Sequence, residues 1–295
     1  MLDGPACAGG FVVRDAGPSD VGRVFEIYSQ ALGALDEVGR EWLEALVRSR
    51  SRRKRVVVVE LDGSVVGFAT VFKRGEVAFL DSIAVDEDVR SRGVGGLLLD
   101  AIEGVLESEG VKSLALSVKN WNLRALDFYL RRGYVVEGVV MMFSADPRRI
   151  NATRPGGRYV VEEIPAEGLK RLRLRPTTWW SNLIEDVQRI IHKRYLKDEK
   201  AILVRSGRRV RGVVEFSRNG RLFVNYVALS SYNATKVLNE IVYKLKTTAV
   251  KEGLSEIVIP VDASKGLLVS ELAAMNFHTQ ETEYLMTKGL SNHDD

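Results

Sequence analysis

The residues with the clearest chemical potential form a glycine-rich run that follows an apolar segment. The run consists of Arg90, Ser91, Arg92, Gly93, Val94, Gly95 and Gly96. Glycines let the backbone approach a ligand closely, and the N–H groups and positive dipole end of a helix's first turn favour an anion. Because an amphipathic segment follows, the run predicts a loop that binds a pyrophosphate group. A capped helix whose glycines serve close packing is the alternative that glycine spacing leaves open.

Two better-known phosphate-binding loops do not fit this run. A Walker loop requires Gly-Lys followed by Ser or Thr, and that sequence occurs nowhere in the chain. A dinucleotide fingerprint requires a third glycine, and Leu98 stands at that position. The nature of the loop therefore depends on a second motif.

The second motif lies further along the chain. It comprises Asn122, Ala125, Phe128, Tyr129, Gly133 and Tyr134. Together the two motifs resemble those of the GNAT superfamily of N-acetyltransferases. That family's acetyl-CoA loop reads Gln/Arg-x-x-Gly-x-Gly/Ala, and its later signature reads Asn-x-x-Ala-x-x-Phe/Leu-Tyr-x-x-x-Gly-Phe/Tyr. Both motifs stand in the family's order, and the resemblance covers residues 11–143.

The resemblance implies acetyl-CoA as cofactor and gives the matching residues their roles. The expected cofactor-binding groups are the backbone of Ile83, Ala84 and Val85 for the pantetheine arm, the loop from Arg90 to Gly96 for the pyrophosphate, and Asn122 for the pantetheine region. Tyr129 would donate a proton to the departing thiolate. A phenol suits that role because its ordinary pKa near 10 keeps it protonated at neutral pH. The alternative for Tyr129 is an aromatic side chain packed in the core.

A transfer reaction of this kind also needs a group that takes a proton from the incoming amine. Asp81 and Glu76 are the acidic candidates on the strand that carries Ile83. Asp81 lies two residues before Ile83 and would share its face of the strand, whereas Glu76 begins the strand and is expected to be solvated. We therefore expect Asp81 as the base, with a chain of water molecules as the alternative.

Length and an internal repeat indicate two copies of one fold. The chain has 295 residues, which suffices for two domains of ordinary size. A shift of 143 positions aligns residues 79–85 with 222–228 and residues 110–114 with 253–257. A segment rich in Pro, Gly and Arg lies between the copies, at residues 145–158. We expect an acetyltransferase domain at residues 1–150 and a second domain at residues 151–295.

The expected fold class is α/β, or α+β, with two tandem GNAT-like mixed β-sheets flanked by helices. Turns containing Asp-Gly and Arg-Gly join three strands of the first copy into an antiparallel meander. Its expected strands cover residues 11–14, 56–61, 65–72, 77–85, 114–118 and 134–143, and its helices begin at residue 18 and cover residues 37–48, 93–109 and 121–132.

The second copy repeats this order but lacks the glycine loop. Residues 230–236 stand at the corresponding place and contain no glycine, and the helix expected at residues 265–274 lacks the Asn and Tyr of the second motif. Its other expected helices cover residues 177–195 and 234–252, and its strands cover residues 159–164, 201–205, 210–216, 222–229, 256–261 and 277–287. It resembles a degenerate GNAT domain that has lost acetyl-CoA binding.

Composition narrows the other possibilities. One cysteine and three histidines are too few for a zinc site or a disulfide framework, so no metal is expected. No apolar stretch has the length of a membrane span, and residues 1–10 do not read as a secretion signal, so a cytoplasmic location is expected. Residues 1–150 carry 20 basic and 22 acidic residues, and residues 151–295 carry 23 and 17. This modest, scattered excess does not favour a nucleic acid partner.

Two functions remain to be distinguished. The first is an acetyl-CoA-dependent N-acetyltransferase whose acceptor is the primary amine of a small molecule or a protein. The second is a non-catalytic acyl-CoA-binding or interaction module with a basic C-terminal half. Asn122 and Tyr129 favour the enzyme, and nothing in the sequence identifies the amine or the oligomeric state.

Overall fold

A computed structural model describes residues 6–8, 10–35, 39–48, 51–165, 174–178 and 200–290 of the chain. The chain divides into two compact units. Among the described residues, the first unit extends to Glu137 and also includes the chain from Leu285 onward, whereas the second begins at Gly138 and ends at Tyr284. The division lies ahead of the join expected at residues 145–158, because residues 140–145 pair with a strand of the second unit. Most of the helix expected at residues 177–195 lies outside the described residues.

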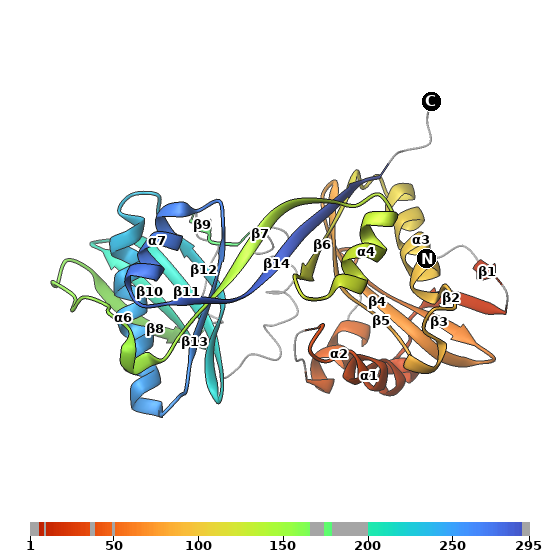
Figure 1. The fold of residues 1–295 in the computed structure, drawn as a ribbon, viewed down its shortest axis with the longest axis horizontal. Coiled ribbons are helices and arrows are strands. Elements are labelled where there is room, and N and C mark those ends of the chain that lie inside the picture. Colours follow the sequence, from red (N-terminus) through yellow and green to blue (C-terminus); the bar gives the residue numbers. More distant parts are fainter. Residues whose placement is uncertain are drawn as a thin grey trace. The chain divides into compact units, whose positions relative to one another are not determined.

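The first unit is a mixed sheet with helices on both faces, which confirms the expected α/β class (Figure 1). Its strands follow the order β1 to β6 across the sheet; β1 to β5 are antiparallel neighbours and β5 and β6 are parallel. The strands are β1 (Ala6–Ala8), β2 (Phe11–Asp15), β3 (Lys54–Leu61), β4 (Ser64–Arg74), β5 (Val77–Val85) and β6 (Ser113–Lys119). The helices are α1 (Val21–Gln30), α2 (Arg40–Arg48), α3 (Val94–Ser108) and α4 (Leu123–Arg131).

Neighbouring residues of β4 show how the two helix layers are held. Gly67 lies against α3, where a Cβ atom would come within 3.1 Å of Val94 and 3.2 Å of Leu98. Phe68 stacks on Tyr28 of α1, with ring centroids 5.9 Å apart. Because successive residues of a strand point to opposite faces, α1 and α3 cover opposite sides of the sheet. The absence of a side chain at Gly67 lets α3 pack directly on the backbone of β4.

A β-bulge in β5 lies where this strand stops pairing with β6, although its end still pairs with β4. Thr70 pairs with Ser82 and Val71 with Leu80, so Asp81 has no residue opposite it. The pairing of β5 with β6 runs from Val77 to Leu80 and stops there. The two strands thus part from the bulge onward, and the backbone of residues 83–85 borders the opening between them.

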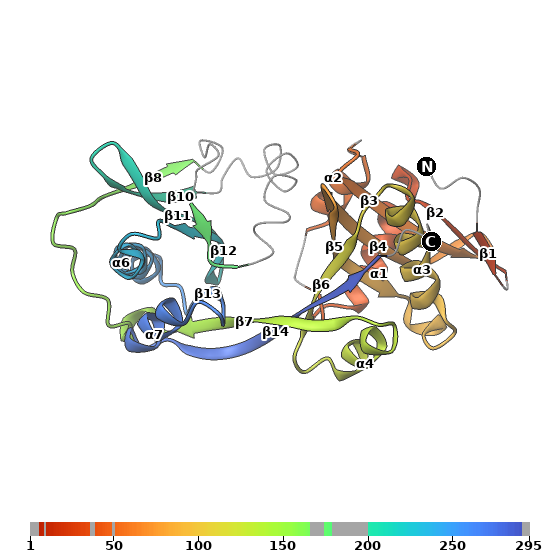
Figure 2. The ribbon, with the colours of Figure 1, turned by 90° about the horizontal axis from the view of Figure 1, so that it is seen from above.

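The second unit repeats this architecture. Its strands are β7 (Val135–Ala145), β8 (Val160–Pro165), β9 (Arg175–Pro176), β10 (Lys200–Ser206), β11 (Arg209–Asn219), β12 (Arg221–Leu229), β13 (Ile257–Asp262) and β14 (His278–Gly289), and its helices are α6 (Ala234–Glu252) and α7 (Gly266–Ala274). Figure 2 looks nearly along the axis of α6, which packs on strands β10 to β13. Gly212 of β11 meets α6 as Gly67 meets α3, since its Cβ would come within 2.5 Å of Val237 and 3.2 Å of Ile241.

Strands β7 and β14 each begin in one unit and end in the other. The later part of β7 pairs with β13 of the second unit. The end of β14 belongs to the first unit, where β14 is the neighbour of β6. There the backbone N–H of Leu290 donates a hydrogen bond to the carbonyl oxygen of Lys112, at 2.8 Å. Local sequence patterns do not predict that β7 and β14 begin in one unit and end in the other, because this arrangement depends on pairing between segments that are distant in sequence.

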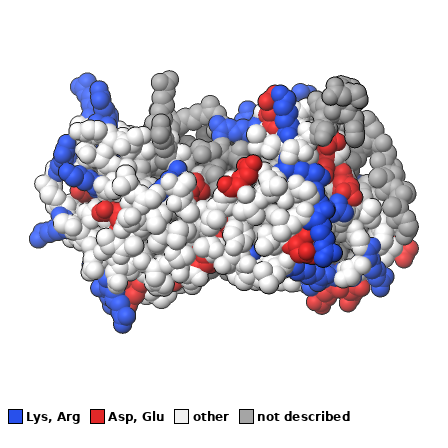
Figure 3. Space-filling view, turned by 45° about the horizontal axis from the view of Figure 1, so that its top comes forward, with Lys and Arg blue, Asp and Glu red and all other residues white. Residues whose placement is uncertain are grey.

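The basic residues of the second unit are partly organised around one carboxylate. Glu163 forms ion pairs with Lys200 (2.8 Å), Lys244 (3.7 Å) and Arg218 (3.8 Å). The hydrogen bond from Lys200 is the main cause that lowers the pKa of Glu163. On the face that Figure 3 shows, the Lys and Arg side chains of this unit lie at separate places rather than in one patch.

Within the described residues, no helix has the length and apolar character needed to cross a membrane.

The tight contact at Gly67 yields a test of this architecture. We expect Gly67→Ala to lower the free energy of unfolding by about 1–3 kcal/mol, because the added methyl group displaces α3 from β4. Gly104→Ala is the matched control: Gly104 lies inside α3 with open space around its Cα, so the same substitution should stabilise by about 0.5–1 kcal/mol. Urea unfolding of the two variants measures both effects. Equal stability of Gly67→Ala and the unsubstituted protein would contradict this packing.

Candidate active site

The glycine-rich loop is held from both sides by hydrogen bonds of charged side chains. At its start, Asp86 accepts a hydrogen bond from the backbone N–H of Asp88 (3.0 Å) and forms an ion pair with Arg23 of α1. Arg90 turns back, and its Nε donates to the carbonyl oxygen of Val85 at 3.1 Å. The loop is therefore attached to both α1 and β5.

The conformation of the loop leaves the first turn of α3 open to an anion. Gly93 occupies the N-cap position in the left-handed region, with φ at 85°, and no side chain caps the helix. The first intrahelical hydrogen bond runs from the N–H of Leu97 to the carbonyl oxygen of Gly93, at 3.0 Å. The preceding amides of Val94, Gly95 and Gly96 have no partner within the helix, as at every helix start. Such amides, together with the helix dipole, form a binding site for phosphate.

The three glycines serve different purposes. Gly93 provides the left-handed turn, which costs any other residue strain. Gly95 borders the open side, where a Cβ would meet Phe128 and Val85 at an ordinary 3.8 Å. At Gly96 a Cβ would lie 2.2 Å from a guanidinium nitrogen of Arg132. The close-packing explanation is thus correct for Gly96, whereas Gly93 shapes the loop.

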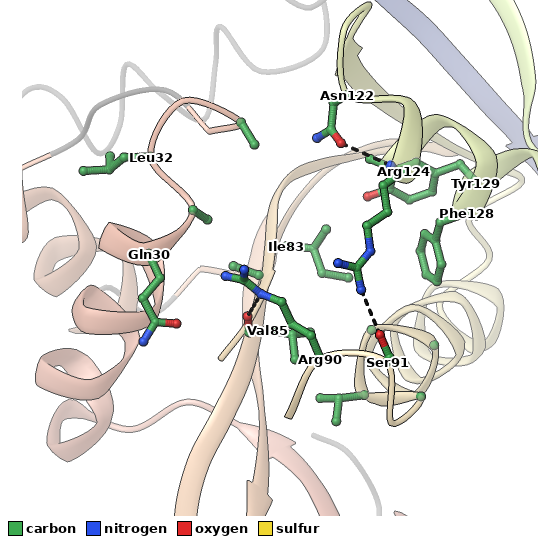
Figure 4. A pocket seen from close by; sticks show the side chains of 18 of the residues that line it. Gln30, Leu32, Ile83, Val85, Arg90, Ser91, Asn122, Arg124, Phe128 and Tyr129 are labelled. Carbon is green, nitrogen blue, oxygen red and sulfur yellow. Dashed lines mark hydrogen bonds between the residues drawn. The ribbon is translucent and has the colours of Figure 1, made fainter. Parts of the chain in front are cut away.

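A pocket of about 530 Å³ lies next to this helix start and contains most of the predicted residues (Figure 4). Gln30 and Leu32 lie on one side, α4 lies on the other, and the end of β5 lies between them. Of the predicted cofactor-binding residues, the pocket is lined by Ile83, Ala84, Val85, Arg90, Ser91, Gly93, Val94, Gly95, Gly96, Asn122 and Tyr129. Arg92 does not line it; its backbone N–H donates to the carbonyl oxygen of Val89 at 3.4 Å.

Asn122 and Arg124 connect α4 to the loop. The side-chain oxygen of Asn122 accepts a hydrogen bond from the N–H of Ala125 (3.2 Å) and so caps α4. This bond uses the oxygen and leaves the amide group of Asn122 at the pocket. Arg124 donates to the hydroxyl oxygen of Ser91 at 3.1 Å. Sequence reasoning missed Arg124, although it stands inside the second motif.

Tyr129 is buried and points into the pocket (Figure 4). Its ring makes edge-to-face contacts with Phe128 and Tyr134, at centroid distances of 5.1 and 5.4 Å. Burial raises the pKa of the Tyr129 hydroxyl above its ordinary value, since removal from water disfavours the charged phenolate. The hydroxyl group therefore stays protonated throughout the neutral range. Tyr129 is both a packed aromatic residue and a proton donor facing the pocket.

The two acidic candidates lie outside this pocket. Asp81 is the bulged residue of β5, and Glu76 is exposed and forms an ion pair with Lys112 at 2.7 Å, consistent with the solvated position expected for it. Within the part of the chain that the structure describes, none of the residues that line the pocket is an Asp or Glu. The pocket thus brings together the loop, residues 83–85, Asn122 and Tyr129, but not Asp81.

The corresponding place in the second unit is filled by the chain itself. A bulge at Asn225 of β12 matches the bulge at Asp81, and the pairing of β12 with β13 likewise ends before it. Beyond the bulge, however, β9 pairs with Ala228 and Leu229.

Thr177, directly after β9, connects the two strands that part there. Its N–H donates to the carbonyl oxygen of Val227, its carbonyl oxygen accepts from the N–H of Asp262, both at 2.9 Å, and its hydroxyl donates to the carbonyl oxygen of Pro260 at 3.2 Å. Thr177 and Thr178 are both buried. Residues 177 and 178, where a helix was expected to begin, are therefore not helical, and the remainder of that expected helix lies outside the described residues. In the first unit the equivalent backbone, residues 83–85, borders the pocket.

Comparison with known proteins agrees with this geometry. Residues 22–134 match the model of the Acetyltransferase (GNAT) family. An L-methionine sulfoximine/L-methionine sulfone acetyltransferase of Pseudomonas paraeruginosa is 24% identical over 141 residues, which are 43% of this chain and 81% of that protein. An uncharacterised N-acetyltransferase of Methanocaldococcus jannaschii is 26% identical over 142 residues, 44% of this chain and 63% of that protein.

Solved structures match the fold over nearly the whole chain. A tandem GNAT protein from the clavulanic acid biosynthesis pathway, 13% identical, has a TM-score of 0.72 and covers 96% of this chain and 100% of its own. A GCN5-related N-acetyltransferase of Sphaerobacter thermophilus, 14% identical, has a TM-score of 0.63, and the match covers 98% of this chain and 99% of that protein. Residues 22–134, which lie in the first unit, thus match the Acetyltransferase (GNAT) family, and the solved structures share the fold of both units.

A charge placed at Gly93 tests the anion site. We expect Gly93→Asp to weaken binding of coenzyme A by about 10- to 100-fold, because the new carboxylate caps the first-turn amides and repels the pyrophosphate. Gly110→Asp is the control, since Gly110 also has a positive φ and open space but lies at the other end of α3. Titration calorimetry with coenzyme A distinguishes the two. Equal affinity of both variants would place the pyrophosphate elsewhere.

Proposed function

We propose that the first unit binds acetyl-CoA and transfers its acetyl group to a primary amine. One observation carries the proposal: a single pocket combines unpartnered amides at a helix start with a buried, protonated Tyr129. The amides suit a pyrophosphate, and the phenol suits a departing thiolate. A pocket of about 530 Å³ also has room for the pantetheine arm and the thioester.

The lining residues suggest how the cofactor would lie. The pyrophosphate would accept hydrogen bonds from the amides of residues 94–96, with the guanidinium group of Arg124 beside it. The pantetheine arm would follow the backbone at residues 83–85, where the strands part. The side-chain amide of Asn122 would donate to this arm, and the thioester would then reach Tyr129. Residues that sequence reasoning did not name, such as Gln30 and Trp121, would line the approach of the amine.

The reaction on this arrangement is a direct displacement. The amine nitrogen attacks the thioester carbonyl carbon, a C–N bond forms and the C–S bond breaks. The amine loses one proton, and the leaving sulfur takes one from Tyr129, which recovers its proton from water. A backbone amide near Ile83 would donate to the carbonyl oxygen and stabilise its developing charge. No carboxylate of the described residues lines the pocket, so we propose that the amine's proton leaves through water, with Asp81 as our candidate acceptor beyond it.

The acceptor is proposed only as a class, a primary amine of a small molecule or a protein. Among the described residues, the lining contains no acidic side chain, so the amine panel should include amines that are neutral at the assay pH. The relative from Pseudomonas paraeruginosa is named for acting on L-methionine sulfoximine and L-methionine sulfone. These two free amino acids therefore belong in a first panel of acceptors.

A conservative change at Tyr129 tests the chemistry. We expect Tyr129→Phe to lower kcat by about 10²- to 10⁴-fold, the range of general acid catalysis, because the thiolate then leaves unprotonated. Acetyl-CoA affinity should stay within about twofold, since the ring remains in place. Initial rates with an amine panel and calorimetry measure the two quantities. If the unsubstituted protein binds acetyl-CoA but acetylates no amine, the non-catalytic acyl-CoA-binding module is the better explanation.

The filled second unit makes a prediction about stoichiometry. We expect one acetyl-CoA per chain, because Thr177 already uses the backbone groups to which a second pantetheine arm would bind. Calorimetry of the full chain should give a single site, and Gly93→Asp should remove that site alone. A second site that persists in Gly93→Asp would contradict this prediction, because residues 175–178 would then have to move out of the opening when the cofactor binds.

A further inference from the structure

The end of the chain contributes a charged side chain to the interior of the first unit. Lys288 lies in the segment that follows the second unit in sequence but belongs to the first. Its Nζ is 2.6 Å from a carboxylate oxygen of Glu103, on α3. The Glu103 side chain is 11% exposed and that of Lys288 is 29% exposed, so the ion pair is largely removed from water.

The other oxygen of Glu103 binds a tyrosine next to the proposed proton donor. The hydroxyl of Tyr134 donates to it at 2.8 Å. Lys288 also lies over the ring of Tyr134, with Nζ 5.7 Å from the centroid, which is cation–π distance. Tyr134 is 1% exposed, so its ring position depends on these partners and on packing.

Tyr134 in turn fixes Tyr129. The rings meet edge to face at 5.4 Å and 65°, and the N–H of Tyr134 donates to the carbonyl oxygen of Tyr129 at 3.1 Å. Burial raises the pKa of Tyr129, and none of the described residues forms a hydrogen bond with its hydroxyl. The direction of the Tyr129 hydroxyl therefore follows from how its ring is packed.

We propose that Glu103 and Lys288 are positioning residues for acetyl transfer, which hold Tyr129 in place through Tyr134. The proposal rests on the function proposed above. It makes the last strand of the chain part of the catalytic unit, although that strand follows the second copy in sequence. An ion pair that is largely removed from water adds little net stability compared with apolar residues of similar size. Stability alone therefore does not explain a charged pair at this position next to Tyr134.

Substitutions at both members of the pair test the proposal in the full-length protein. Lys288→Met keeps the apolar stem and removes the charge, Lys288→Arg restores a cation, and Glu103→Gln combined with Lys288→Met removes both charges. Lys112→Met is the matched control, because Lys112 forms an ion pair with Glu76 in which both side chains are 64% exposed. Initial rates give kcat and the KM for acetyl-CoA of each variant.

We expect Lys288→Met to lower kcat by about 10- to 100-fold, the effect of a small displacement of a reacting group, with KM for acetyl-CoA changed less than about twofold. Lys288→Arg should recover most of kcat, and the double variant should lose less than Lys288→Met because no unpaired carboxylate remains. Lys112→Met should change neither constant. A lower melting temperature with unchanged kcat, or losses that multiply in the double variant, would overturn the proposal.

A second measurement keeps the test independent of turnover. In protein labelled with fluorotyrosine, the fluorine NMR signal that disappears in Tyr129→Phe belongs to Tyr129. We expect that signal to shift or broaden in Lys288→Met and to stay unchanged in Lys112→Met. If no amine is acetylated but the signal moves, the proposed function fails and the positioning contact stands. If the signal does not move, the positioning role is wrong.

Discussion

The parting of β5 from β6 is the constraint on which the site depends. Beyond the bulge, β5 still pairs with β4 but no longer with β6. The backbone groups on the β6 side therefore need a hydrogen-bonding partner from another source where they are buried. In the first unit these groups border a pocket open to a ligand. In the second unit, Thr177 supplies the partners from the chain itself. The same fold can thus leave the opening between the parted strands free for a ligand, as in the first unit, or close it with a segment of the chain, as Thr177 does in the second unit.

The position of α3 follows from the same strands and would decide where an anion binds. Gly67 lets the helix lie directly on β4, and Gly96 leaves room for Arg132, whose guanidinium also lies 5.2 Å from the ring centroid of Phe128. These contacts place the first turn of α3 at the pocket that residues 83–85 also line. Close packing and ligand binding are therefore not alternatives for the glycine-rich loop, since the packing glycines place the helix whose amides face the ligand.

The sequence predicted the parts of this structure that depend on neighbouring residues. The glycine spacing, the place of Asn122 in the second motif and the helical position of Tyr129 are local, and the structure brings all three to one pocket. Simple alternation placed Asp81 on the face of Ile83, but the bulge interrupts the β5 register at that residue. The contact of Lys288 with Glu103 joins residues 185 positions apart, so no local pattern could indicate it. The hydrogen bonds of Thr177 with Val227, Asp262 and Pro260 likewise join segments distant in sequence, so local helix propensity did not predict them.

The second copy has lost the features of a cofactor site without losing its architecture. It keeps the bulge, now at Asn225, and the close contact of Gly212 with its helix, because these determine the sheet and its packing. It lacks the glycine loop and the motif tyrosine, the residues that line the pocket of the first unit. Since its last strand ends in the first unit with Lys288 against Glu103, this copy cannot be removed without also removing part of the first unit's interior. That dependence is a physical reason for a degenerate copy to remain in the chain.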